Sequence, residues 1–374
     1  MTLLRGRAYL DGKIEDDVSI RVANGRIDEV SAGAATGDRD PLILPGFIDV
    51  HVHGGDGADF MDGTVDAVRA VSRFHARHGT TSLAATTLSC SREQILGAIN
   101  AIVAAAAERS DDMPEIPAIH LEGPYLAPSR SGAQDRGSLR SANLDEMEEW
   151  IEAANQLRLI ATVAPDCDGV LELIDRFASR ILFSIGHTEA GYDRCLESVA
   201  RGAGHFTHLF NAMPPLHHRS PGPVGAAIDS EQATAELIAD GVHVHPVVLA
   251  SIVRLMPGRI TLVTDAMRAS GKEDGTWRLQ EYDVAVRNGV ARLGDGTLAG
   301  SLLTMDAAVR NMVNLAKLDL AEVVPLATET PARILGVADR KGRIARGFDA
   351  DLVVMSAELE VERVFIRGIE IDLD

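Results

Sequence analysis

Apolar and polar positions follow different patterns at the two ends and in the middle of the chain. Residues 1–45 consist of short apolar and polar segments in alternation, with turn signals at Asp11-Gly12 and Asn24-Gly25. Such dipeptides are typical of β-hairpin turns. The C-terminal stretch "ADLVVMSAELEVERVFIRGIEI" has the same strand-like pattern. Both ends of the chain are therefore predicted to be β-rich.

The middle of the chain alternates between strand and helix patterns. Eight runs have the composition of strands: "GFIDVHVH", "TTSLAATTL", "IPAIHLEG", "LRLIATVAPD", "RILFSIGHT", "GAGHFTHLF", "AELIADGVHV" and "RITLVTDA". Helical patterns lie between most of them, at 64–79, 91–109, 143–155, 169–179, 191–201 and 246–256. Strands this apolar indicate a parallel sheet buried on both faces. Eight such units predict a (β/α)8 barrel, and a doubly wound open sheet is the alternative.

Two further segments complete this pattern after the eighth strand. Residues 275–300 contain Asn288-Gly289 and Asp295-Gly296, which predicts an inserted hairpin. Residues 301–336 are expected to supply the last helices of the barrel.

Composition and charge narrow the classes of partner. The chain has 374 residues, of which 46% are apolar and 24% charged, as in globular proteins. The net charge of −19, from 55 acidic and 36 basic residues, argues against nucleic acid or an anionic membrane as the main partner. A small anionic substrate stays compatible with this charge, because a local arginine can bind it.

Cysteine usage and the N-terminus bear on the compartment. Cys90, Cys167 and Cys195 are far apart and form no CxxC motif, which argues against a disulfide scaffold and fits the reducing cytoplasm. The start of the chain has no apolar stretch of the length of a signal peptide, and no run approaches the ~18 apolar residues of a membrane span. A cytoplasmic location is therefore expected.

Side chains with metal-binding or acid–base chemistry lie at the ends of most predicted strands. In barrel enzymes the active site forms at the C-terminal ends of the strands, so these side chains are expected to meet at one rim. His51 and His53 end the first strand and point the same way, because successive side chains on a strand alternate in direction. The other members of the set are Glu122 after strand three, His187 after strand five, His208 near the end of strand six, His243 after strand seven and Asp265 after strand eight.

This set of ligands predicts a metal-dependent hydrolase. Imidazoles and carboxylates without a thiolate suit zinc, iron(II), cobalt or manganese. A metal lowers the pKa of a bound water to ~7, which produces hydroxide at neutral pH. Asp265, at the same rim, is the candidate general base that takes the proton of the water and then delivers it as a general acid.

The remaining histidines are expected to have structural roles. His75 and His78 lie three apart on the first helical pattern and are expected on a solvated face. His120 and His205 are expected to make structural hydrogen bonds, and His245, before Pro246, is expected to cap a helix or to lie on the surface. Asp49 shares the face of His51 and is expected at most to support the ligands.

Several motifs together resemble a known family. "PGFIDVHVHG" is similar to the first-strand signature of the amidohydrolase superfamily. "HLEGPYL", "IGHTEA", "THLFNAMPPLHHRSPG", "ADGVHV" and "LVTDAM", in this order, resemble the N-acetylglucosamine-6-phosphate deacetylases within it. The resemblance continues through "GRIARGFDADLVV" into the C-terminal β-rich segment. It implies a barrel at 46–339 with a small β-sandwich built from 1–45 and 340–374.

The resemblance also implies a reaction and a metal site. The reaction is the hydrolysis of N-acetyl-D-glucosamine 6-phosphate to D-glucosamine 6-phosphate and acetate by a metal-bound hydroxide, with Asp265 as the catalytic aspartate. Glu122, His187 and His208 match the ligands of the metal that all members keep. His51 and His53 match the ligands of a second metal that only some members bind. One or two divalent ions per subunit are therefore expected, zinc first among them, and Asp265 is expected among the metal ligands as well as being the catalytic aspartate.

Substrate contacts are carried over in the same way. The positions that match substrate-binding residues are Ala133, Gln134, Asn211, Ala212, Arg219, His243, Leu298, Ala299 and Gly300. Arg219 matches an arginine that reaches the phosphate in the neighbouring subunit, which implies a homodimer. Without the resemblance, Arg219 beside His217 and His218 would be interpreted as a solvated loop charge.

One position departs from the pattern of the family. Many members have a histidine where this chain has Gln134, and a glutamine donates a hydrogen bond but carries no proton. Either the metal polarises the acetyl group here, or Gln134 acts as a neutral donor. The surrounding segment 127–137 is expected to be a mobile loop. The rival interpretations are another amidohydrolase, acting on a cyclic amide, an N-acyl amino acid or a dipeptide, and a metal-free structural or binding relative.

Overall fold

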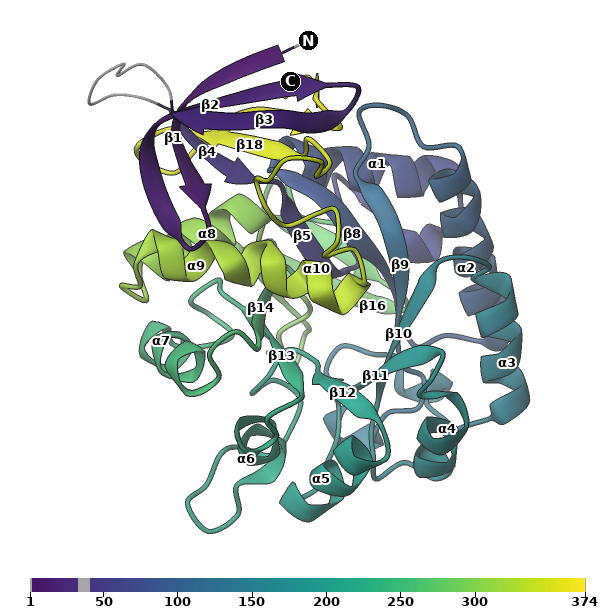
Figure 1. The fold of residues 1–374 in the computed structure, drawn as a ribbon. Helices are drawn as coiled ribbons and strands as arrows, with labels where there is room; N and C mark the ends of the chain where they lie inside the picture. The colour runs from purple at the N-terminus through teal and green to yellow at the C-terminus, as the bar shows by residue number, and fades with distance from the viewer. Residues whose placement is uncertain (1, 33–40, 374) are drawn as a thin grey trace.

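The core of the molecule is a barrel of eight parallel strands. The computed structural model describes residues 2–32 and 41–373. The strands are hydrogen-bonded in the order β14-β13-β12-β11-β10-β9-β8-β5 (Figure 1). Their bounds are β5 (Phe47–Val52), β8 (Thr80–Thr87), β9 (Glu115–Glu122), β10 (Arg158–Val163), β11 (Ile181–Ile185), β12 (Ala203–Phe206), β13 (Thr234–Ile238) and β14 (Ile260–Val263).

The two end strands of this sheet meet just beyond their C-terminal ends. The backbone N–H of Asp265 donates to the carbonyl of His51 at 2.9 Å, and the N–H of His53 donates to the carbonyl of Ala266 at 3.0 Å. These bonds close the sheet on the side of the candidate site. The barrel is therefore confirmed, and the open sheet, the alternative interpretation, is not formed.

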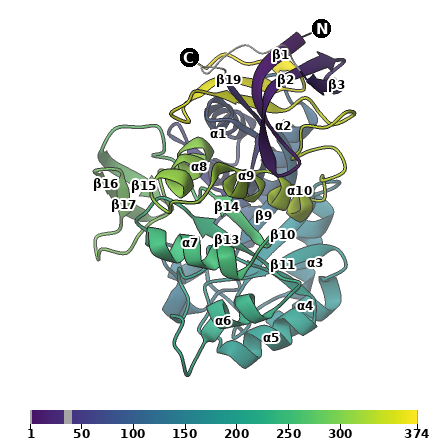
Figure 2. The same ribbon diagram turned by 60° about the vertical axis from the view of Figure 1, so that its left-hand side comes forward.

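Helices cover the outside of the barrel, as the periodic patterns predicted (Figures 1 and 2). They are α1 (Val65–Arg77), α2 (Arg92–Ala107), α3 (Leu144–Ala153), α4 (Val170–Phe177), α5 (Tyr192–Ala200), α6 (Gly222–Asp229), α7 (Pro246–Leu255), α8 (Met305–Asn314), α9 (Leu320–Ala327) and α10 (Glu329–Leu335). Side-chain caps begin several of them, and His245 caps α7 as expected, by accepting from the N–H of Val247.

Helix α6 was not predicted. Its sequence, "GPVGAAID", contains two glycines and a proline, which are poor helix formers. The helix forms because it is buried: Val224, Ala226 and Ala227 lie in the main apolar core. Tertiary packing, which a propensity argument does not include, stabilises this short segment.

The segment after the eighth strand is a sheet of three strands. β15 (Gly275–Leu279), β16 (Tyr282–Arg287) and β17 (Val290–Arg292) pair in antiparallel fashion, where one hairpin was predicted. Asn288 and Gly289 form the turn between β16 and β17 with φ of 52° and 74°. The apolar face of this sheet packs on Leu88 and Met267, beside the mouth of the barrel.

Both ends of the chain build a second, smaller unit. Its strands are β1 (Thr2–Leu10), β2 (Lys13–Ala23), β3 (Arg26–Ala32), β4 (Leu42–Pro45), β18 (Leu352–Met355), β19 (Val361–Ile366) and β20 (Ile369–Glu370). They form one mixed sheet in the order β20-β19-β18-β4-β1-β2-β3, with its own apolar core. The expected terminal β domain is thus confirmed, and its division from the barrel at 45/46 and 339/340 stays a prediction.

Short elements complete the rim of the barrel. They are β6 (Gly54–Gly55), β7 (Ala58–Asp59) and the 3-10 turns Phe60–Asp62, Pro128–Arg130 and Arg136–Ser138. Within 2–32 and 41–373, no helix is long and apolar enough to cross a membrane.

The expectation for His75 was wrong. His75 on α1 is fully buried, and its Nε2 lies 2.9 Å from the carbonyl oxygen of Gly54. Burial lowers the pKa of His75 to about 4, so the ring is neutral at physiological pH. His78 is half-buried, with its Nδ1 3.3 Å from Asp306. The helical pattern placed both side chains together, but the rim turn that follows His53 covers His75.

Candidate metal centre and active site

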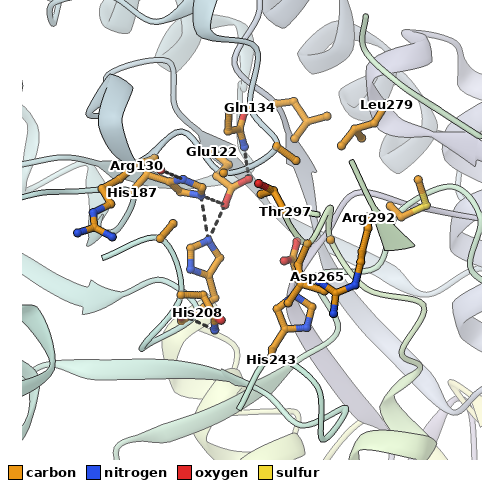
Figure 3. A pocket seen from close by; sticks show the side chains of 18 of the residues that line it. Glu122, Arg130, Gln134, His187, His208, His243, Asp265, Leu279, Arg292 and Thr297 are labelled. Atoms are coloured by element: carbon orange, nitrogen blue, oxygen red, sulfur yellow. Dashed lines mark hydrogen bonds and ion pairs between the residues drawn. The ribbon is translucent and has the colours of Figure 1, made fainter. Parts of the chain in front are cut away.

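The predicted side chains meet around one cavity at the C-terminal rim of the barrel. The cavity has a volume of about 470 Å³ (Figure 3). The predicted residues that line it are His53, Glu122, Ala133, Gln134, His187, His208, Asn211, Ala212, His243, Asp265, Leu298 and Gly300. His51, fully buried, lies beneath this surface. Side chains at the ends of six different strands therefore converge on this cavity.

Glu122, His187 and His208 form one potential metal-binding group. Their ligand atoms lie within 4.8 Å of one another. The Oε1 of Glu122 is 3.1 Å from the Nε2 of His187 and 3.1 Å from the Nε2 of His208, and the two nitrogens are 3.0 Å apart (Figure 3). Both histidines follow their strands in left-handed backbone, with φ of 45° and 29°. This uncommon conformation turns both rings toward Glu122.

His51 and His53 form a second group with the same glutamate. Their Nε2 atoms are 3.1 Å apart, and the Nε2 of His53 lies 3.3 Å from Oε2 of Glu122. The Nε2 of His51 lies 3.4 Å from Oε1 of Glu122. Oε1 of Glu122 therefore faces His187, His208 and His51, and Oε2 faces His53, so this one carboxylate could contribute to both groups.

The hydrogen bonds behind two of these rings, those of His187 and His51, fit metal ligation. The Nδ1 of His187 lies 2.8 Å from the carbonyl oxygen of Arg130, and the Nδ1 of His51 lies 2.9 Å from a carboxylate oxygen of Glu236. In the neutral ring that binds a metal, an acceptor at Nδ1 holds the proton there and leaves Nε2 with a lone pair directed at the cluster. Lone pairs and a carboxylate brought this close together are stabilised by a cation between them. The residues thus fit a divalent metal, and the donor set contains no sulfur.

Charge keeps the carboxylates of the site ionised. Burial favours protonation of Glu122, but the imidazoles of His51 and His187 hold its pKa well below the usual range. Burial likewise opposes ionisation of Asp265, and the hydrogen bond from His53 with the charge of His51 lowers the pKa of this carboxyl. Both groups are therefore negative at neutral pH.

Asp265 lies where a base is needed. Its Oδ1 is 3.2 Å from the Nε2 of His53 and 3.6 Å from that of His51. Its backbone has φ of 48°. The backbone N–H of Asp265 donates to the carbonyl of His51 at 2.9 Å, and its carbonyl accepts from the N–H of Ser301 at 2.7 Å. The side chain consequently projects into the cavity between the cluster and His243 (Figure 3).

Gln134 contacts the cluster directly. Its amide nitrogen donates to Oε2 of Glu122 (Figure 3). Its amide oxygen accepts from the N–H of Ser89 at 2.8 Å. The Ser89 contact fixes which end of the amide faces Glu122. Gln134 thus acts here as a neutral donor to the shared carboxylate.

The other predicted substrate residues divide into two sets. Asn211, Ala212, Leu298 and Gly300 line the cavity. Ala299 lies between the last two, but its side chain is buried in the apolar cluster with Leu88 and Met267. Its backbone N–H donates to the carbonyl of Ala291 at 3.1 Å, which joins this loop to the three-stranded sheet.

Arg219 does not reach the cavity of its own chain. It is exposed on the loop before α6, and its guanidinium lies 2.7 Å from the Nε2 of His218. Leu216, on the same loop, is 49% exposed.

The structure adds residues that the sequence analysis did not select. Asp240 lies 2.7 Å from the Nδ1 of His243; burial lowers the pKa of His243, but this carboxylate outweighs burial and raises it. Arg292 and Thr297 line the same cavity (Figure 3). Glu236, on β13, is fully buried behind His51. A lone glutamate inside the apolar run "AELIA" was the one available signal for Glu236.

Comparisons with known proteins agree with this geometry. The amidohydrolase family model matches residues 42–370. The N-acetylglucosamine-6-phosphate deacetylase of Bacillus subtilis (strain 168) is 39% identical over 363 residues, which are 96% of this chain and 90% of that protein. The N-acetylgalactosamine-6-phosphate deacetylase of Escherichia coli O157:H7 is 35% identical over 356 residues, which are 94% of each chain.

A solved structure matches over the same length. It is a mutant of the N-acetyl-D-glucosamine-6-phosphate deacetylase from Mycobacterium smegmatis in complex with N-acetyl-D-glucosamine-6-phosphate. It has a TM-score of 0.92, is 34% identical and covers 99% of both chains. From the rim cluster, the full-length sequence similarity and this structural match, we conclude that the chain belongs to the amidohydrolase family, within the branch of the amino-sugar-phosphate deacetylases.

Proposed function

We propose that this protein hydrolyses N-acetyl-D-glucosamine 6-phosphate to D-glucosamine 6-phosphate and acetate, with a divalent metal as cofactor. The observation that carries this proposal is the shared Glu122, whose carboxylate faces His187 and His208 as well as His51 and His53, beside Asp265. The names of the relatives and of the solved structure supply the substrate class.

The chemistry divides between the metal and Asp265. A divalent ion held by these residues would activate water and polarise the acetyl carbonyl. Asp265, ionised and within the cavity, takes a proton from the attacking water. It then delivers that proton to the amide nitrogen as the carbon–nitrogen bond breaks, so that acetate and the amine leave. Glu122, His187 and His208 would hold one ion, and His51 and His53 would hold a second with Glu122.

The sugar phosphate is expected to bind in the same cavity, next to the metal ligands. Asn211, Ala212 and His243 all line the cavity and are the residues expected to contact the sugar phosphate. Asp240 raises the pKa of His243 against the opposing effect of burial, which favours a protonated ring that attracts an anion. Gln134, engaged with Glu122, leaves polarisation of the acetyl group to the metal.

We infer a homodimer in which Arg219 binds the phosphate in the partner's cavity. Arg219 is exposed and outside its own cavity, and an arginine fork suits a phosphate. The apolar side chain of Leu216, which is 49% exposed on the same loop, supports an interface there.

Zinc is the proposed metal, because nitrogen and oxygen ligands without sulfur suit it, and iron, cobalt or manganese are the alternatives.

A cytoplasmic location also stays a prediction. Cys90, Cys167 and Cys195 are all free, as expected in a reducing compartment.

The first experiment measures acetate release by metal-stripped and zinc-reloaded protein. The substrates are N-acetylglucosamine 6-phosphate, N-acetylglucosamine and N-acetylgalactosamine 6-phosphate. We expect fast, metal-dependent release from the first and little from the unphosphorylated sugar. The third is included because a relative with that specificity matches at 35% identity. No release from any of them by metal-loaded protein would overturn the proposal and favour an amidohydrolase that acts on other amides.

A further inference from the structure

A buried carboxylate lies behind the candidate metal ligands and is not among the residues proposed to bind metal or substrate. Glu236, on β13, has an exposed fraction of 0%. Burying a charge is unfavourable unless hydrogen bonds replace the lost water. Both carboxylate oxygens of Glu236 have partners: Oε1 lies 3.1 Å from the Nε2 of His205, and Oε2 has two contacts on the side of the cluster.

The first of these contacts determines the tautomer of His51. Oε2 of Glu236 lies 2.9 Å from the Nδ1 of His51. An ionised carboxylate only accepts hydrogen bonds, so the proton of a neutral His51 ring must reside on Nδ1. The Nε2 of His51, 3.1 Å from that of His53, is then the atom with the free lone pair. His51 is thereby prepared to bind a cation.

The second contact reaches the other pair of histidines. The same Oε2 accepts the backbone N–H of His208 at 2.9 Å. His208 needs such support because its backbone has φ of 29°. One buried oxygen therefore touches a residue of each metal-binding group, although these residues are 157 positions apart in the chain.

We propose that Glu236 is a positioning residue that orients His51 for a second metal ion and ties it to the group of His187 and His208. This inference rests on the proposed function only in requiring two divalent ions per chain. A hydrogen-bonded carboxylate behind a histidine ligand fixes the ring and raises its basicity, and its loss typically weakens metal binding about 10- to 100-fold.

Direct ligation of an ion by Glu236 is the competing role. Ligand atoms of Glu236, His51 and His120 lie within 4.8 Å of one another. The nitrogens of His120, however, lie 3.0 Å from the carbonyl of Val50 and 2.7 Å from Oγ1 of Thr162. Both oxygens of Glu236 are also occupied. The hydrogen bonds thus favour a supporting role over ligation.

The test uses Glu236→Gln with Thr234→Val as the matched control. Glu236→Gln keeps the shape and allows the amide oxygen to accept from His51 and His208, but it removes the negative charge. Thr234 lies on the same strand with its Oγ1 2.6 Å from the Nδ1 of His205, on the side away from His51. Thr234→Val therefore alters the buried network without touching the Glu236–His51 contact.

The readout is cobalt(II) binding to metal-stripped, full-length protein, followed by its visible d–d spectrum and by competition with a chelator. We expect two ions per chain in the wild type and in Thr234→Val. In Glu236→Gln, we expect one ion to bind with near-normal affinity and the other at least about tenfold more weakly. Two ions at wild-type affinity in Glu236→Gln would overturn the inference, and so would a single ion in the wild type.

A measurement without substitution covers the case in which Glu236→Gln does not fold. Long-range ¹⁵N–¹H spectra of the zinc-loaded wild type report which nitrogen of His51 carries the proton, and His51→Asn identifies its signals. A proton on Nδ1 is expected, and a ring with its proton on Nε2 would overturn the inference. Absence of deacetylation with normal metal binding would instead contradict only the proposed substrate.

Discussion

The two pairs of histidines at the rim reach the same glutamate in different ways. His51 and His53 lie at the end of an extended strand, where alternation alone places both rings on one face. His187 and His208 follow β11 and β12 in left-handed backbone, with φ of 45° and 29°. The orientation of His51 and His53, the strand-borne pair, thus depends on local backbone geometry. The orientation of His187 and His208, the loop-borne pair, depends on neighbouring residues that hold an uncommon backbone conformation.

The surroundings of the loop-borne pair are closely packed. Gly186 precedes His187, and a Cβ added there would lie 2.8 Å from Cβ of Thr207 and 2.9 Å from Cγ2 of Thr162. Both threonines belong to a polar network inside the barrel, in which Thr207 bonds Thr162 at 2.7 Å and Ser184 at 2.5 Å. The orientation of His187 therefore depends on the closed barrel beneath it.

The largest expected effect concerns Asp265, which lies against the strand-borne pair. Asp265→Asn removes the base but keeps the size of the side chain, so both pairs of histidines are expected to retain their metal. Turnover of N-acetylglucosamine 6-phosphate should fall by roughly 10²- to 10⁴-fold, the usual contribution of a general base. The measurement is kcat beside metal content. Near-normal turnover at full metal content would assign the base to another residue.

The next effect separates the two pairs directly. His208→Asn should weaken binding of the first ion by more than the roughly 10- to 100-fold typical of a supporting residue, because it removes a ligand. His53→Asn should remove only the second ion and leave part of the turnover.

Metal content after gel filtration and kcat distinguish the two variants. Equal loss of both ions in His53→Asn would mean that the two groups do not bind metal independently. In that case the shared Glu122, rather than either pair, would control the site.

A smaller effect is expected on binding of the substrate phosphate, for which two arginines can be compared. Arg292 lines the cavity of its own chain, whereas Arg219 is exposed outside it. If Arg219 acts across a dimer, Arg219→Met should raise KM for the phosphorylated sugar by about tenfold, in keeping with the loss of one charge-assisted hydrogen bond. KM for the unphosphorylated sugar should not change.

Arg292→Met provides the comparison within one chain. A larger rise in KM for Arg292→Met than for Arg219→Met would indicate that residues of a single subunit bind the phosphate. Sedimentation of the wild type and of Arg219→Met, run alongside, shows whether a dimer is present at the assay concentration.

The smallest expected effect tests the packing beneath the loop-borne pair. Gly186→Ala should reduce the free energy of unfolding by about 1–3 kcal/mol, as overpacking of a close-packed site does. It should also weaken binding of the ion held by His187 and His208, and leave the ion of His51 and His53 unaffected.

Gly97→Ala is the matched control. Gly97 lies in α2 with free space around the added Cβ, so this change should stabilise the helix by about 0.5–1 kcal/mol. Thermal unfolding and metal titration measure both variants. Unchanged stability and metal binding in Gly186→Ala would show that the loop-borne pair is not constrained by this contact.

Much of the fold could be predicted from the sequence because the signals are short-range. Alternation and helical periodicity revealed the eight strand–helix units and the β-rich termini. The same units placed His51, Glu122, His187 and Asp265 at strand ends, where a barrel brings side chains together. Short-range patterns did not reveal α6, the third strand of 275–300 or the burial of His75, because each depends on packing against distant parts of the chain.

Only the tertiary structure decided how the site is supported. Glu236 and His51 are 185 residues apart, and their 2.9 Å contact exists because β13, β14 and β5 follow one another around the closed barrel. The contact of Gln134 with Glu122 likewise depends on a loop that folds back over the rim. The sequence by itself determined which side chains could act, since local backbone geometry sets the face they occupy. Their partners were decided by strand order and barrel closure, which join segments that no local pattern relates.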